Sequence, residues 1–132
     1  MLKNAKASAR IPVADLDRAR EWYSQKLGLE PSEEREGGLW YRLGDTAFGL
    51  FESTGESSGT HSQMGFEVDD IEAVVADLRE RGLEFEEYDM GLEVNDGITE
   101  IPGNYPSKGS GERAVWFKDL DGNLLGIGQP VR

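Results

Sequence analysis

The stretch that decides the fold is residues 7–29, ASARIPVADLDRAREWYSQKLGL. Residues 7–13 alternate small or apolar side chains with polar ones, which is typical of a strand with one buried face. Asp15 then provides a helix N-cap, and Gly28 is expected to end that helix in the left-handed conformation. The apolar residues between them recur at spacings of three and four, so the helix is amphipathic. They are Leu16, Ala19, Tyr23 and Leu27.

The same pattern recurs 55 residues further along the chain. Val13-Ala14-Asp15-Leu16 aligns with Val68-Asp69-Asp70-Ile71, after a second alternating segment at residues 63–68. Asp69 or Asp70 caps the second helix, with Glu72 as its capping-box partner, and Gly82 ends it. A repeat that contains both a strand and a helix predicts two similar modules, residues 1–58 and 59–132, within one domain.

Further strands are expected after each helix. The segments that look like strands are 39–43, 46–52, 83–88, 114–117 and 123–128, with turns at Gly44-Asp45 and Asp121-Gly122. Residues 89–112 are the least periodic part of the chain and are interpreted as a long loop, which raises the expectation of a functional role. The helices would cover one face of each sheet. The opposite faces are then left to enclose a further group or molecule.

Composition excludes several classes of protein. The chain has 132 residues, no cysteine and a net charge of −12, so a disulfide framework and a cysteine zinc site are absent and a nucleic-acid binder is disfavoured. The same negative field would attract a cationic ligand, although acidity also keeps proteins soluble. No apolar run is long enough for a membrane helix, and the start of the chain lacks the apolar region of a secretory signal, so a cytoplasmic location is expected.

Three motifs, in this order, resemble the vicinal oxygen chelate superfamily. They are Val13-Ala14-Asp15-Leu16-Asp17-Arg18-Ala19, Trp22-Tyr23 followed by Leu27-Gly28-Leu29, and Phe117-Lys118-Asp119-Leu120-Asp121-Gly122-Asn123. That group includes glyoxalase I, extradiol dioxygenases, fosfomycin-resistance enzymes and bleomycin-binding proteins. The resemblance implies an α+β fold of two βαβββ modules, whose curved mixed sheets enclose a cavity with the helices outside. It also implies a homodimer.

The resemblance further implies four metal-ligand positions, normally His or Glu. In this sequence they fall on Ser8, near Leu50, on Gln63 and on Gly126. None of these four residues is a good ligand for a divalent ion. We therefore expect no metal and no other cofactor, with a divalent metal held by other residues as the alternative.

Candidate ligand-binding residues come from the expected inner strand faces, the aromatic residues and the long loop. They are Ser8, Arg10, Trp40, Phe48, Leu50, Gln63, Tyr105 and Trp116. Trp40 and Phe48 lie on neighbouring strands and fit either the core or a pocket wall, and Arg10 fits either a structural pair with Glu67 or a substrate contact. Ile101 is a further loop residue expected near the cavity mouth.

Candidates for acid–base chemistry are His61, Glu67, Glu52 and Tyr41. Three of them also have a purely structural interpretation. His61 would be an exposed residue at the end of a loop, and Glu52 and Glu67 would be solvated carboxylates at strand ends.

Three hypotheses about function follow. The leading one is a metal-free member of this superfamily that binds an organic small molecule, cationic or aromatic, in a cavity lined by the sheets. The alternative is an enzyme, either a metal-dependent lyase, isomerase or dioxygenase with non-standard ligands, or a metal-free proton-transfer enzyme. The third is an interaction module whose cavity is packed by its own aromatic residues.

Overall fold

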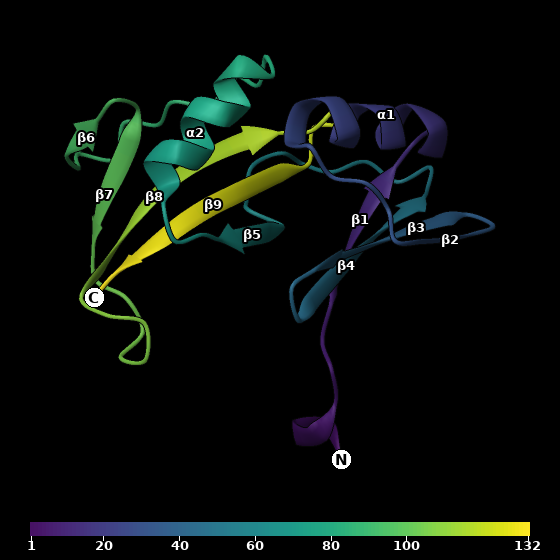
Figure 1. Cartoon of the computed structure of the whole chain (residues 1–132), viewed down its shortest axis with the longest axis horizontal. Coiled ribbons are helices and arrows are strands. Elements are labelled where there is room, and N and C mark those ends of the chain that lie inside the picture. Colours follow the sequence, from purple (N-terminus) through teal and green to yellow (C-terminus); the bar gives the residue numbers. More distant parts are fainter. The chain divides into compact units, whose positions relative to one another are not determined.

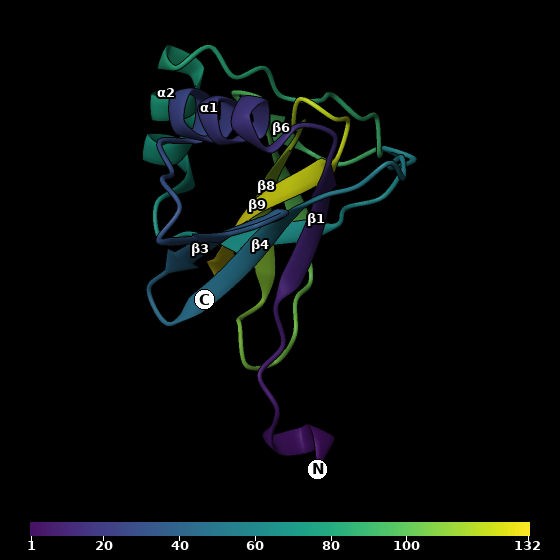
Figure 2. The same cartoon turned by 90° about the vertical axis from the view of Figure 1, so that its right-hand side faces the viewer.

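The computed structural model describes residues 1–132, which divide into two units, residues 1–57 and 58–132. Each unit contains one α-helix and one mixed sheet (Figures 1 and 2). The predicted α+β fold, with a helix and a mixed sheet in each repeat, is confirmed. Neither helix is long and apolar enough to cross a membrane.

The first unit has a four-stranded sheet in the order β1-β4-β3-β2. β1 runs parallel to β4, and the other pairs are antiparallel. Its elements are a short 3-10 helix (Leu2–Asn4), β1 (Ala9–Val13), α1 (Leu16–Leu27), β2 (Glu33–Arg35), β3 (Gly38–Leu43) and β4 (Thr46–Glu52). The predicted caps of α1 are confirmed: the Asp15 side chain accepts hydrogen bonds from the Asp17 and Arg18 backbone N–H groups, and Gly28 is left-handed at φ 69°.

The core of the first unit lies between α1 and one face of its sheet. Side chains alternate along a strand, so only every second residue points toward the helix. Tyr23 of α1 packs there against Tyr41 and Phe48, whose rings stack at 4.9 Å with an interplanar angle of 4°. Ile11 and Leu50 complete this layer, each almost fully buried.

The second unit has a five-stranded sheet in the order β5-β9-β8-β7-β6, with only β5 and β9 parallel. Its elements are β5 (Met64–Glu67), α2 (Ile71–Glu80), β6 (Val94–Asn95), β7 (Ile98–Pro102), β8 (Gly111–Lys118) and β9 (Leu124–Val131). Asp70 rather than Asp69 caps α2, through a hydrogen bond from the Ala73 N–H.

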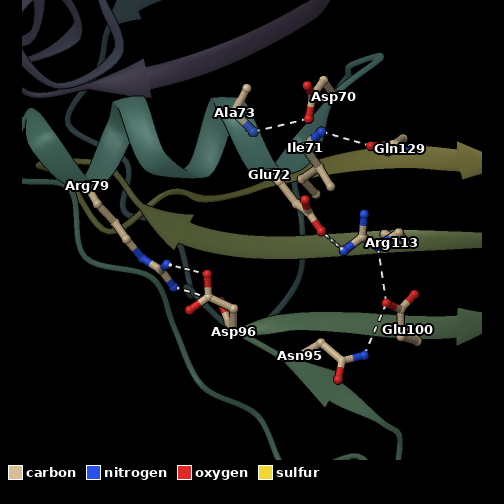
Figure 3. A network of polar contacts seen from close by, with 10 residues as sticks. All are labelled: Asp70, Ile71, Glu72, Ala73, Arg79, Asn95, Asp96, Glu100, Arg113 and Gln129. Atoms are coloured by element: carbon tan, nitrogen blue, oxygen red, sulfur yellow. Dashed lines mark hydrogen bonds and ion pairs between the residues drawn. The ribbon is translucent and has the colours of Figure 1, made fainter.

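Polar contacts fasten α2 to its sheet (Figure 3). The Arg113 guanidinium on β8 donates to Glu72 Oε1 at 2.8 Å and to Glu100 Oε1 at 3.1 Å. Gln129 of β9 accepts from the Ile71 N–H at 2.8 Å. Glu72, predicted to complete a capping box, forms an ion pair with the sheet instead. The face of α2 that packs in the core is formed by its buried side chains, which are Ile71, Val75 and Leu78.

Two expectations about the second unit are wrong. Residues 83–88 are not a strand; only Glu86 pairs, in an isolated bridge with Trp116. The supposed loop 89–112 contains β6, β7 and the first residues of β8. β6 and β7 form a hairpin around Asp96-Gly97, both with positive φ (53° and 80°), as a type I′ turn requires.

Candidate functional site

In each unit, every second strand residue points away from the helix; we call this the helix-free face. In the first unit, cross-strand register places Glu33, Trp40, Gly49 and Arg10 in one row across β2, β3, β4 and β1. The next row contains Arg35, Gly38, Phe51 and Pro12. With the exception of Pro12, the residues of these two rows line a hollow of about 310 Å³.

The centre of this hollow is built on a glycine. A Cβ added to Gly49 would stand 3.2 Å from the Trp40 ring and 3.4 Å from Arg10 Cδ. Because Gly49 has no side chain, the indole and the Arg10 side chain both reach over its backbone from the flanking strands. The guanidinium carbon of Arg10 lies 5.1 Å from the centre of the Trp40 ring, within the range of a cation–π contact. The result is an aromatic wall beside a cationic group.

The second unit repeats the tryptophan–glycine pair. Trp116 of β8 lies opposite Gly126 of β9, and a Cβ on Gly126 would be 3.3 Å from the indole. Tyr88 packs edge-on against Trp116 at 5.9 Å. Gly65 and Gly128 flank Gly126 on the same face, and these three glycines line a hollow of about 290 Å³.

The charged groups of the second hollow come from three segments. Lys108 forms an ion pair with Glu67, which holds the pKa of that carboxyl below its ordinary value by hydrogen bonding and charge attraction. The Glu112 side chain lies over Gly128, where an added Cβ would overlap its carboxylate. The second hollow therefore carries one carboxylate that no ion pair compensates.

Three predicted site residues lie on the helix side of the first sheet instead. Phe48 and Leu50 are buried in the core at 2% and 1% exposure, although Leu50 also borders the hollow. The nearest residue of β4 on the helix-free face is Gly49. Tyr41 is also buried, its hydroxyl lacks a hydrogen-bond partner, and burial raises its pKa to about 12. A phenol held in the core this way is not placed for proton transfer with a ligand.

The other predicted residues lie near strand ends or in loops. Ser8 is exposed just before β1, and Glu52 is exposed at the end of β4. His61 is exposed in the loop before β5, with its Nδ1 3.2 Å from Ser58 Oγ. Gln63 is half-buried directly before β5, and Tyr105 is 74% exposed beyond β7.

The residues at the resembled metal positions do not fit a divalent ion. They offer the Ser8 hydroxyl, the Gln63 amide and the backbone near Leu50 and at Gly126, with no carboxylate, imidazole or thiolate to balance the charge of a divalent ion. Elsewhere in the chain, no three His, Asp or Glu side chains converge as a metal site would require.

Sequence reasoning missed most residues of the hollows, among them several with charged or aromatic side chains. Arg35 and Phe51 line the first, and Lys108 and Glu112 line the second. Arg35 lies in β2, a strand of three exposed residues without an apolar alternation that would reveal it. For Glu112, the alternation of β8 with the buried Val115 and Phe117 was the available signal.

Comparisons with known proteins agree with this geometry. A model of the Glyoxalase/Bleomycin resistance protein/Dioxygenase superfamily matches residues 7–127. A search of curated proteins found no match.

Three solved structures show the similarity in fold. A glyoxalase/bleomycin resistance protein from Catenulispora acidiphila is 25% identical, with a TM-score of 0.67 and 97% and 100% of the two chains covered. Virulence protein STM3117 from Salmonella typhimurium is 18% identical, with a TM-score of 0.70 and 99% and 100% covered. TnmS3, an antibiotic binding protein from Streptomyces, is 24% identical, with a TM-score of 0.64 and 99% of each chain covered.

Proposed function

Because the chain belongs to the Glyoxalase/Bleomycin resistance protein/Dioxygenase superfamily, we propose that it is a metal-independent member that binds a flat organic molecule. The molecule binds on the helix-free face of a sheet and lies against a tryptophan. We also propose that the protein is a homodimer, as the family resemblance implies.

The observation that carries this proposal is the tryptophan–glycine pair, present once in each sheet. In both pairs the indole stands beside a position where a Cβ would come within 3.2–3.3 Å of it. This arrangement leaves an aromatic surface and bare backbone exposed to a hollow of about 300 Å³, which is the lower end of the size range of small-molecule sites. An aromatic ligand gains both apolar burial and ring stacking there.

Two further points support binding without a metal. The residues at the resembled ligand positions lack the donors that a divalent ion needs. TnmS3, which shares the fold, is described as an antibiotic binding protein, so sequestration of an organic molecule is compatible with this scaffold.

Native mass spectrometry on protein purified without chelator or added metal tests the proposal. The expected result is a dimer without stoichiometric metal, and with any co-purified molecule of organic composition. One tightly bound metal per chain would overturn the metal-independent proposal and would support a lyase, isomerase or dioxygenase with non-standard ligands.

Binding itself is tested by thermal shift with a panel of aromatic compounds, since a ligand that binds only the folded state raises the melting temperature. We expect stabilisation that is lost in a Trp40→Leu, Trp116→Leu double variant. The same stabilisation in that variant would contradict the role of the indoles.

A further inference from the structure

Basic side chains gather on the helix-free face of the first sheet, although the chain carries a net charge of −12. Register places Arg10, Arg35 and Arg42 on this face, against one carboxylate, Glu33. The charge of this sheet face is therefore opposite to the charge of the protein, and two of the three arginines, Arg10 and Arg35, line the hollow. This local charge, rather than the total, acts on a ligand within a few ångströms of the sheet, because exposed charges further than about 10 Å away are largely screened by salt.

The N–H donors of the Arg10 guanidinium are not used in an ion pair. Arg10 forms none of the seven ion pairs of the structure, and its one specific contact is with the Trp40 ring. A guanidinium has five N–H donors in its plane. Contact with an aromatic ring leaves that set of donors available to a carboxylate or a similar planar anion.

Arg35 reaches into the same hollow from the opposite edge of the sheet. Its Cγ and Nε would lie 3.5 and 3.6 Å from a Cβ on Gly38, so its side chain lies across the backbone of β3 as Arg10 lies across β4. Of the two acidic residues in this hollow, Glu34 is already paired with Arg20 at 3.1 Å. Glu33 is then the one carboxylate that opposes the two arginines.

We propose that the hollow of the first unit selects a planar aromatic anion, with its ring system against Trp40 and its carboxylate on Arg10 and Arg35. This inference rests on the proposed function and adds the charge of the ligand. It replaces the cationic ligand that the net charge favoured. The second hollow is not equivalent, because its uncompensated Glu112 carboxylate repels an anion.

Three probes of nearly equal shape separate the contribution of the aromatic ring to binding from that of the ligand's charge. They are 2-naphthoate, 2-naphthamide and 2-naphthylmethylammonium. Titration calorimetry on the full chain gives each dissociation constant at about 0.15 M ionic strength, where charges further than about 8 Å away are largely screened. We expect naphthoate to bind about tenfold more tightly than naphthamide, the usual gain from one charge-assisted contact, and the ammonium compound to bind most weakly.

Single substitutions show which residues produce the preference for naphthoate over naphthamide. Arg10→Met keeps the length of the side chain and removes its charge, and we expect it to bring naphthoate affinity closer to that of naphthamide, because only Arg35 then contacts the carboxylate. Glu33→Gln should strengthen naphthoate binding. Arg18→Met, an exposed arginine of α1 outside the hollow, should leave it unchanged.

The outcomes separate the two proposals. If naphthamide or the ammonium compound binds as tightly as naphthoate and Trp40→Leu abolishes that binding, the aromatic site stands and the anion preference is overturned. If none of the probes binds at millimolar concentration, both the preference and the aromatic site in this unit are overturned. Equal losses from Arg10→Met and Arg18→Met would also contradict the preference, because they would reflect only the total charge.

Discussion

Phe48 and Trp40 lie on neighbouring strands of one hairpin but on opposite faces of it, so their replacement should have opposite consequences. Phe48 is 2% exposed, and its ring stacks on Tyr41 at 4.9 Å and lies 6.2 Å from Tyr23. Phe48→Ala deletes a buried ring and leaves a cavity, which costs about 3–5 kcal/mol. In a chain of this length that loss lowers the melting temperature by about 10–20 °C.

Trp40 is only half-buried, and its contacts on this face are with Gly49 and Arg10. Trp40→Ala should therefore cost about 1–2 kcal/mol, from partial loss of apolar burial. It should, however, weaken naphthoate binding at least tenfold, because it removes the aromatic wall. Phe48→Ala, assayed at a temperature where it remains folded, should bind naphthoate nearly as the unsubstituted protein does.

Urea unfolding gives the stabilities, and calorimetry gives the affinities. A shift of the midpoint at constant slope reports a change of stability alone. The reasoning is refuted if Trp40→Ala costs as much stability as Phe48→Ala. That result would mean that the indole is core in solution and that the hollow is closed, as in an interaction module.

Three further predictions concern the second unit and the core tyrosine. Gly103 and Gly109 share a φ near 130°, but an added Cβ meets nothing at Gly103 and overlaps the Val131 carbonyl oxygen at Gly109. In urea unfolding, Gly103→Ala should therefore cost about 1 kcal/mol and Gly109→Ala at least about 2 kcal/mol more; equal costs would contradict the overlap. Glu67 should titrate below 4.5 in a carboxyl NMR titration because Lys108 lowers its pKa. Its stabilising effect is present above the unfolded pKa and is lost as pH falls through the folded one, and an unchanged Glu67 pKa in Lys108→Met would disprove the pairing. Tyr41, with a pKa of about 12, should contribute stability below pH 10 that is lost as pH rises through 12. An absorbance component titrating near pH 12 should disappear in Tyr41→Phe.

The strand–helix repeat could be predicted from the sequence because each residue pattern that marks it spans only a few neighbouring residues. Asp15 and Gly28 fix the ends of α1 through contacts within a few residues, and the offset copy at Asp70 predicts α2 in the same way. The region after α2 was misread for a different reason. Its strands are short, and β7 ends in Pro102, so their apolar alternation is weak. The Asp96-Gly97 turn was the one clear sign of a hairpin.

The candidate site was only partly readable, because a strand has two faces and the sequence does not say which face a helix will cover. Trp40 and Phe48 lie on opposite faces of the β3–β4 hairpin. A shift of one residue in the predicted strand register would move each side chain to the other face, so a core residue would be taken for a site residue. Arg10 was placed on the correct face because β1 alternates cleanly. Its contact with Trp40 depends on Gly49 between them, which is a cross-strand relation that no local pattern encodes.

The two tryptophan–glycine pairs also limit which substitutions the chain tolerates at Gly49 and Gly126. Replacing Gly126 by an acidic residue would place a Cβ 3.3 Å from the Trp116 indole, and the same change at Gly49 would place one 3.2 Å from Trp40. The indole must shift by a few tenths of an ångström before a new side chain fits at either position. A substitution that adds a metal donor there therefore also disturbs the aromatic wall, so the two kinds of site compete for the same positions of the sheet.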